Sequence, residues 1–460
     1  SSVNASGRSR PLTRSRASGM REPSGGRANT NTVSSEVTPD TSVGESVTVP
    51  DTDAEAGFAA IDTTQVIRRT VRYADGALAV AGRTYDLTKV RRLLLVGVGK
   101  CAYEAARELE RMLGSKIADG VVIAPACGAL SFARGYEGDH PYPSLRNVRA
   151  TKELVQLLTD ATADDLVVAV ISGGGSTLLC LPDGPATHED EAALVRHLSS
   201  RGANIAELNT VRKHLSRARG GFLAAHSYPA PLVTLIFSDV PGDRLEFVSS
   251  GPTVRDTTTV ADARAVLEKY EAAGACPGIG AALIETPKEE RFFERVVNIL
   301  AVSNETALAA MQRETERQGF AATVRNPAFA GEARDLAFRF LADLHASPAG
   351  SALLYGGEST VTVTSAGEGG RNQELALSGL RDVRDGELLL ALATDGRDNT
   401  DAAGAICDTM TKEHARARGL DIERGLAENA SYRFFQTSGD AVRTGTTGSN
   451  VADVVLCLKS

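Results

Sequence analysis

Two segments of the sequence combine glycines with side chains that can bind an anion. Residues 97–100 read Gly-Val-Gly-Lys, and residues 172–177 read Ser-Gly-Gly-Gly-Ser-Thr. Glycine lets the backbone approach a ligand closely, and the amides at a helix N-terminus favour negative charge. We therefore predict a phosphate-binding or substrate-binding site with Lys100 as its cation. Its loop residues are Gly97, Gly99, Ser172, Gly173, Gly174, Gly175 and Ser176.

Other interpretations of these two segments exist. The first has nearly the G-x-G-x-x-A spacing of a dinucleotide-binding turn, ending at Ala102. No acidic residue ends a second strand about 20 residues later, as such a turn requires, because Asp119 precedes the next expected strand. The P-loop spacing is also missing. A strand-to-helix turn with a solvated lysine, and a flexible linker at 172–177, are the structural alternatives.

Polar residues follow further apolar runs. Asn209 and Lys213 lie in a basic segment that we place at a helix start and predict to bind phosphate or substrate; a solvated basic face is the alternative. Asp239 follows another strand and could bind Mg²⁺ with phosphates, or could simply form a turn. Arg371 is expected in the first turn of a helix, where a basic side chain opposes the helix dipole. An anionic partner would compensate for this unfavourable interaction with the helix dipole, unless Arg371 is an ordinary surface residue.

Short apolar runs predict the strands that position these loops, and Ala102–Leu113 has helical spacing. Uninterrupted apolar strands that alternate with helices indicate a mainly parallel sheet covered on both faces. Ligands bind such sheets at the carboxyl ends of the strands. The predicted strands are 93–96, 121–124, 166–171, 232–237, 296–302, 352–355 and 388–393.

Composition narrows the class of protein. A chain of 460 residues is long enough for two domains, and a net charge of −8 argues against nucleic-acid binding. The six cysteines form no CxxC pair, which favours reduced thiols and a cytoplasmic location. No apolar run is long enough to span a membrane. Residues 1–55 lack periodicity and are predicted to be a disordered extension, with a transit peptide or an over-extended start as alternatives.

Nine motifs, in this order, resemble the glycerate kinases that carry a MOFRL C-terminal domain. The resemblance covers nearly the whole chain after about residue 60. The motifs are VGVGK at 96–100, GDHPYP at 138–143, ISGGGST at 171–177, LNTVRKHLS at 208–216, FSDVPGD at 237–243, SSGPT at 249–253, GGRNQEL at 369–375, TDGRDNTDAAGAI at 394–406 and TGTTGSNVAD at 444–453.

The resemblance implies ATP-dependent and Mg²⁺-dependent phosphorylation of D-glycerate, usually on the 2-hydroxyl. It implies a two-domain α/β fold with the active site in the interdomain cleft. Residues 56–290 would form a Rossmann-like domain with a mainly parallel sheet. Residues 291–460 would form an α/β domain that is MOFRL-like from about residue 350. In that family a lysine and an arginine form the functional basic pair, and they match Lys100 and Arg371.

The remaining expectations concern the metal, the partners and the rival activities. Asp239, Glu358 and Asp395 are the Mg²⁺ candidates. The expected partners are ATP and D-glycerate, with no nucleic acid or membrane, and a homodimer is allowed. One rival is an NAD(P)-dependent hydroxypyruvate reductase, and the other is a non-catalytic sensor of phosphorylated metabolites. The chain departs from the family pattern at Arg219, where a lysine is commoner.

Overall fold

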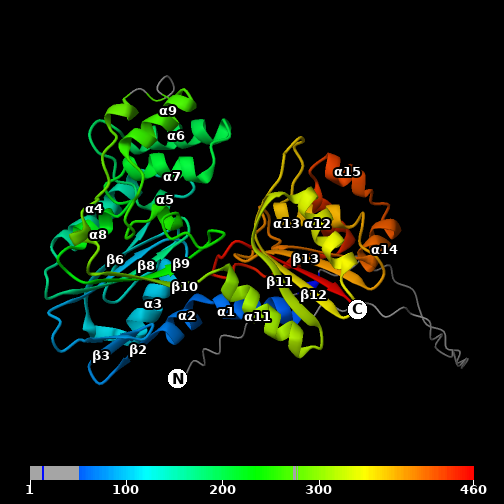
Figure 1. The fold of residues 1–460 in the computed structure, drawn as a ribbon, viewed down its shortest axis with the longest axis horizontal. Helices are drawn as coiled ribbons and strands as arrows, with labels where there is room; N and C mark the ends of the chain where they lie inside the picture. Colours follow the sequence, from blue (N-terminus) through cyan, green and yellow to red (C-terminus); the bar gives the residue numbers. More distant parts are fainter. Residues whose placement is uncertain (1–12, 15–50, 273–275, 277) are drawn as a thin grey trace, which may run out of the picture. The chain divides into compact units, whose positions relative to one another are not determined.

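The computed structural model describes residues 13–14, 51–272, 276 and 278–460, which form two compact units (Figure 1). The N-terminal unit comprises Ala56–Ala310 and Thr447–Ala452. The C-terminal unit comprises Met311–Thr446 and Asp453–Ser460, together with the described residues before Ala56. Most of the extension predicted to be disordered lies outside the described residues.

A six-stranded sheet forms the core of the N-terminal unit. Its strand order is β10-β9-β8-β5-β6-β7, and every neighbouring pair is parallel, which confirms the predicted mainly parallel sheet. β10 therefore adds a strand beyond residue 290 to this sheet. The strands are β5 (Leu93–Val98), β6 (Ile117–Ala124), β7 (Arg134–Glu137), β8 (Leu166–Ser172), β9 (Leu232–Phe237) and β10 (Val296–Val302).

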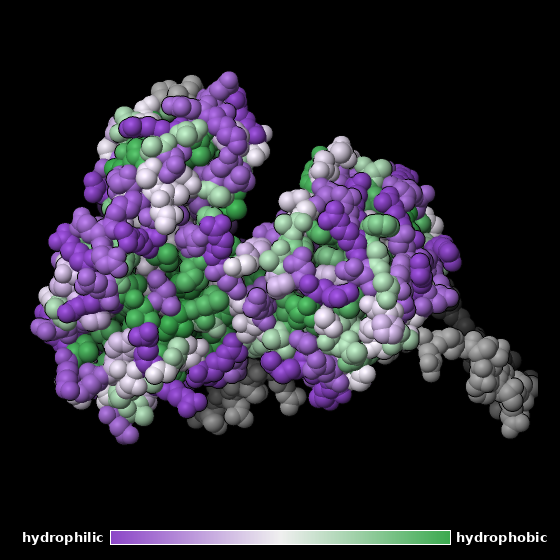
Figure 2. Space-filling model, in the orientation of Figure 1, coloured by the Kyte–Doolittle hydropathy of each residue, from purple (hydrophilic) through white to green (hydrophobic). Residues whose placement is uncertain are grey.

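Apolar runs explain why these strands are buried. Every residue of β5, β8 and β9 is buried, so both faces of the central sheet are covered. β10 is an edge strand, and its Leu300 is 42% exposed. Figure 2 shows apolar side chains gathered over the region where β10 lies in Figure 1. The covering helices are α2 (Thr63–Thr70), α3 (Ala102–Leu113), α4 (Leu145–Thr159) and α8 (Phe222–Ser227).

Further elements complete the N-terminal unit. Helices α6 (His188–Ser200), α7 (Ile205–His214) and α9 (Val260–Lys269) form a cluster beside the sheet, with an apolar core of its own (Figure 1). A small antiparallel sheet contains β2 (Val71–Ala74), β3 (Ala77–Val80) and β4 (Arg83–Asp86).

The C-terminal unit contains a mixed sheet with the order β1-β15-β14-β13-β16-β12-β11, in which only β11 and β12 pair in parallel. The prediction of parallel strands was therefore wrong for the run 388–393. An uninterrupted apolar run reports burial on both faces but not strand direction, and the last strand of the chain inserts between β12 and β13. The strands are β1 (Thr13–Arg14), β11 (Ala321–Glu332), β12 (Ser351–Thr360), β13 (Glu387–Ala393), β14 (Gly404–Asp408), β15 (Ala441–Arg443) and β16 (Asp453–Lys459).

Helices α12 and α13 pack on this mixed sheet and share its largest apolar cluster. The longer helices are α1 (Asp51–Ile61), α11 (Asn304–Arg317), α12 (Ala333–Ala346), α13 (Arg371–Gly379), α14 (Thr409–Ala417), α15 (Ile422–Ala427) and α16 (Ser431–Ser438). None of the described helices is long and apolar enough to cross a membrane. All six cysteines are free thiols.

Asp53 supplies a prediction about stability. Its side chain is fully buried, Oδ1 accepts a hydrogen bond from Gln318 Nε2 at 2.8 Å, and burial raises its pKa to about 6. A carboxyl group whose pKa rises on folding costs stability above the folded pKa, and that cost disappears as the pH falls toward 4. We expect Asp53→Asn to raise the melting temperature at pH 7.5 and to give a smaller gain at pH 4.5. Thermal melts at both pH values, with the exposed Asp382→Asn as control, test this; equal gains at both would contradict it.

Candidate active site

The two predicted glycine loops meet at the carboxyl ends of β5 and β8, which are neighbours in the parallel sheet. The backbone amide of Lys100 donates to the carbonyl of Gly173 at 2.9 Å, and that of Cys101 donates to Ser172 Oγ at 3.2 Å. Gly99 has a φ of 126°, and a Cβ there would lie 2.1 Å from Ser172 Oγ. The close approach of the two loops therefore requires glycine at this position.

A pair of serines joins the loops from a third segment. Ser249 Oγ donates to the carbonyl of Ser172 at 2.6 Å, and the hydroxyls of Ser176 and Ser250 lie 2.8 Å apart. Ser250 Oγ also donates to Asn209 Oδ1 at 2.7 Å, so Asn209 belongs to the same cluster. Ser249 and Ser250 have φ values of 53° and 61°, a region that non-glycine residues seldom occupy and that is enriched at functional sites.

Asp239 and His140 border the glycine loop. A Cβ on Gly173 would lie 1.8 Å from Asp239 Oδ2, and a Cβ on Gly174 would lie 3.5 Å from the His140 ring and 3.2 Å from Lys100 Cγ. Burial lowers the pKa of His140, and the charges of Lys100 and Arg212 lower it further. The cluster therefore combines a neutral imidazole with cations, hydroxyls and a carboxylate.

His140, Ser249 and Ser250 were not among the predicted site residues. The motifs GDHPYP and SSGPT contain them. Two consecutive hydroxyls before Gly-Pro, and a histidine before Pro, were the available signals. Neither motif indicated which side chain faces the glycine loops.

Lys213, which we predicted as a substrate-binding residue, pairs with a carboxylate outside the cluster around the glycine loops. Its helix α7 begins at Ile205, with Asn204 as N-cap and a capping box to Glu207, so the prediction of a helix start near Asn209 was wrong. Lys213 falls in the last turn of α7. Its Nζ donates to Asp256 Oδ1 at 3.1 Å, and its side chain is 3% exposed. Burial opposes the charge of Asp256, but Lys213 and hydrogen bonds from Thr258 lower its pKa.

Arg371 is the first residue of α13, as predicted, and two carboxylates supply its anionic partners. Arg371 Nε donates to Asp453 Oδ2 at 2.6 Å, and a second nitrogen donates to Glu358. Burial opposes the charge of Arg371, but these two groups raise its pKa. Burial raises the pKa of Asp453 to about 6, although Arg371 acts to lower it.

The N-terminus of α13 already holds a carboxylate. The backbone amides of Asn372 and Gln373 donate to the buried Asp398 at 3.2 Å and 2.8 Å. Burial raises the pKa of Asp398, and these amides counteract the rise. The Asp395 carboxylate accepts from the amide of Arg397 at 3.0 Å.

The Mg²⁺ candidates fall into both units, with Asp239 in the N-terminal unit and Glu358 and Asp395 in the C-terminal unit. Within the described part of the chain, no group of three or more His, Cys, Asp or Glu side chains is arranged to hold a metal ion. Mg²⁺ bound together with a nucleotide uses one or two carboxylates plus phosphate oxygens, so it does not require such a group. Asp239, against the glycine loop, fits this mode better than Glu358, which is paired with Arg371.

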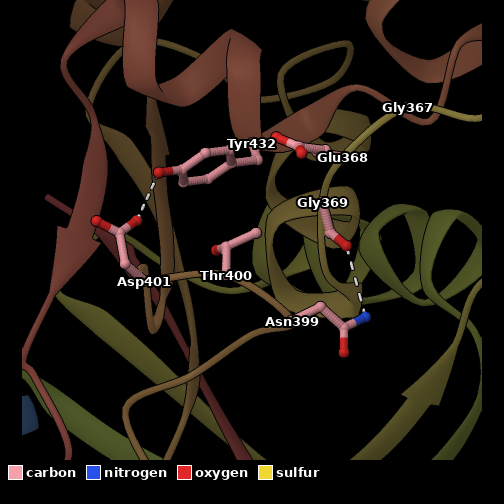
Figure 3. Close-up of a pocket in the computed structure, with 7 residues that line it drawn as sticks. All are labelled: Gly367, Glu368, Gly369, Asn399, Thr400, Asp401 and Tyr432. Atoms are coloured by element: carbon pink, nitrogen blue, oxygen red, sulfur yellow. Dashed lines mark hydrogen bonds between the residues drawn. The ribbon is translucent and has the colours of Figure 1, made fainter.

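A separate pocket of ≈390 Å³ lies in the C-terminal unit (Figure 3). Tyr432 donates to Asp401 at 2.6 Å across it, and Arg443 holds the other oxygen of Asp401 at 3.1 Å. None of the predicted site residues lines this pocket. Its lining residues are Gly367, Glu368, Gly369, Asn399, Thr400, Asp401 and Tyr432.

The contact between Gly173 and Asp239 makes a substitution at Gly173 informative. We expect Gly173→Ala to lower catalytic turnover at least about 100-fold, because the added methyl displaces the Asp239 carboxylate or the loop, and small displacements of catalytic groups cost about this much. The matched control is Gly280→Ala, where a Cβ meets nothing within 4 Å. Steady-state kinetics with circular dichroism of both variants test the prediction, and unchanged turnover of Gly173→Ala would contradict it.

A parallel sheet whose strand ends carry glycine loops, a lysine and several hydroxyls is typical of α/β proteins that bind small anionic ligands. Comparison with known proteins identifies the family. Residues 52–283 match a domain of unknown function, DUF4147, and residues 351–453 match the MOFRL family.

Relatives match over most of their length. Glycerate 2-kinase of Pyrococcus horikoshii is 36% identical over 87% of this chain and 94% of its own. D-glycerate 2-kinase of Thermotoga maritima is 38% identical over 80% and 90%. The crystal structure of glycerate kinase from Thermotoga maritima superposes with a TM-score of 0.78 and 34% identity, covering 89% of this chain and 98% of that one. The chain belongs to the glycerate kinase family.

Proposed function

We propose that this protein transfers the γ-phosphoryl group of ATP to the 2-hydroxyl of D-glycerate, giving 2-phosphoglycerate and ADP. The observation that carries the proposal is the meeting of the Lys100 loop with Ser172 and Gly173 in a chain whose relatives are named glycerate 2-kinases. Phosphoryl transfer needs fixed amides and cations around the phosphate rather than covalent help from the protein.

Each group in the N-terminal cluster has a proposed role. Lys100 neutralises charge on the transferring phosphoryl group, and the backbone of residues 97–100 and 172–176 binds phosphate oxygens. Asn209 holds the Ser250 hydroxyl against Ser176, which orients both hydroxyls toward the ligand. Arg371 is proposed as the second member of the basic pair, held in one orientation by Asp453 and Glu358.

Asp239 is the residue that we propose as a Mg²⁺ ligand, with Asp395 and Glu358 as weaker candidates. The Asp239 carboxylate packs on the loop proposed to bind phosphate, so it can reach an ion that also contacts phosphate oxygens. Mg²⁺ bound there would reduce the negative charge of the nucleotide phosphates. Lys213, which pairs with Asp256, is proposed to act on the site only through the position of α7.

The wider proposals follow from the same assignment. We propose a cytoplasmic enzyme whose partners are small molecules, with a homodimer as the assembly state to test by light scattering. The domain limits at residues 56–290 and 291–460 also remain proposals, and limited proteolysis with mass spectrometry of the fragments tests them.

A coupled assay of ADP release over short hydroxy acids tests the activity. We expect turnover with D-glycerate and Mg·ATP, loss of turnover with EDTA, and a phosphorus NMR spectrum of the product that matches 2-phosphoglycerate. NADH oxidation with hydroxypyruvate would support the reductase instead. A ligand-induced rise in melting temperature without ADP release or NADH oxidation would support the sensor.

A further inference from the structure

Arg212 lies beside the serine cluster. It follows Asn209 by three residues in α7, and residues three apart share one face of a helix. Asn209 Oδ1 accepts the Ser250 hydroxyl, which in turn contacts Ser176. The charge of Arg212 also contributes to the lowered pKa of His140, whose ring borders Gly174. Arg212 is therefore near enough to His140, which borders the glycine loop, for its charge to act on the imidazole.

The carboxylate near Arg212 is already occupied. Glu191 Oε1 accepts from Arg219 at 2.7 Å, and Glu191 Oε2 lies 3.5 Å from Cys180 Sγ. Arg219 is completely buried, so this ion pair is an internal one. The arginine that departs from the family pattern thus takes the direct ion pair with Glu191.

Arg212 forms no ion pair of its own among the described residues, although the charge of Glu191 partly offsets the effects of burial and of Arg219. Its Nε is buried and has no hydrogen-bond partner among the residues that the structure describes. Burial lowers the pKa of Arg212, and the charge of Arg219 lowers it further. The Arg212 side chain as a whole is partly exposed, so a ligand can reach it. An arginine side chain stays protonated in proteins, and a buried donor such as Nε costs free energy until a ligand supplies an acceptor. The adjacent Lys213 pairs with the carboxylate of Asp256 and therefore needs no anionic ligand.

We propose that Arg212 binds the carboxylate of the acceptor hydroxy acid and thereby selects acids over neutral polyols. This assignment rests on the proposed function. The planar guanidinium matches a carboxylate in a bidentate geometry, whereas Lys100 and the loop amides suit the less directional phosphate. The Ser176 and Ser250 hydroxyls, which Asn209 of the same helix holds through Ser250, can bind the hydroxyl groups of the same molecule.

Steady-state kinetics of Arg212→Gln and Arg212→Lys with D-glycerate, glyceramide and ATP test the assignment. We expect Arg212→Gln to raise KM for D-glycerate by about 30-fold or more, which is the lower range for truncating one member of a buried charge pair. KM for ATP and activity on the uncharged glyceramide should change less than about 2-fold. Arg212→Lys keeps the charge but not the planar, two-nitrogen geometry of the guanidinium, so its KM for D-glycerate should lie between the values of the wild type and of Arg212→Gln. The matched control is Arg217→Gln, an exposed arginine paired with Asp183, which should leave all three unchanged.

A second measurement keeps the assignment separate from the proposed activity. D-glycerate alone should raise the melting temperature of the wild-type protein, and this rise should be lost in Arg212→Gln and reduced in Arg212→Lys. If wild-type protein shows this rise but no ADP release, the kinase proposal fails and the Arg212 assignment stands. A raised KM for ATP with an unchanged KM for D-glycerate would overturn the assignment in favour of a nucleotide phosphate. Unchanged kinetics and an unchanged melting rise would overturn it in favour of a purely structural cation.

Discussion

Lys100→Ala should lower kcat for ATP-dependent phosphorylation of D-glycerate by about 10³-fold, the loss typical when a cation that stabilises a transferring phosphoryl group is removed. Lys100 lies two residues after the end of β5, and its backbone amide is held by the carbonyl of Gly173, so the position of its side chain depends on two neighbouring strands. The substitution removes the charge and leaves this backbone contact intact. We therefore expect the melting temperature to change little.

Turnover and thermal melts of Lys100→Ala should be compared with Lys152→Ala, a change of the same kind at an exposed position of α4. Lys100→Arg adds a further test, because it keeps the charge and changes the geometry. We expect it to remain at least about tenfold below wild type, because a displaced charge stabilises the transition state less well. Near-normal turnover of Lys100→Ala would refute the proposed role of Lys100.

Arg371→Ala should lower both stability and turnover. The substitution leaves Asp453, whose side chain is completely buried, without its ion-pair partner. Removal of one partner from a buried pair typically costs about 3–5 kcal/mol of unfolding free energy. The pKa of Asp453 is already raised to about 6 by burial and rises further without Arg371. An acid with a raised pKa costs stability above that pKa, so the defect should be largest at pH 8 and smaller at pH 5.

Denaturant unfolding at pH 8 and pH 5, together with ADP-release kinetics, tests this prediction. The matched control is Arg381→Ala, which removes a more exposed pair with Glu423 in the same unit. The double variant Arg371→Ala, Asp453→Asn removes the unpaired charge, so it should recover most of the stability. If Arg371 also acts on a ligand, the double variant should remain inactive. Recovery of turnover in the double variant would limit Arg371 to a structural role.

The elements of the fold were largely readable from local patterns. The predicted limits of β9, β10 and α3 agree with the structure, because continuous apolar runs and helical periodicity depend only on neighbouring residues. The direction of the strands in the C-terminal sheet could not be predicted from local sequence patterns. β16 enters between β12 and β13 after a long separation in sequence, and no local pattern encodes that position.

The candidate site divides in the same way. The sequence by itself determined the glycine loops around Lys100 and Ser172, because glycines and hydroxyls between a buried strand and a helix are a local signal. Only the tertiary structure brought Ser249 to Ser172, which it follows by 77 residues. The tertiary structure also gave Arg212 and Lys213 different surroundings. These are adjacent basic residues in one helix, and acids distant in sequence distinguish them. Asp256 pairs with Lys213, whereas Glu191 pairs with Arg219 and the Nε of Arg212 has no hydrogen-bond partner among the described residues.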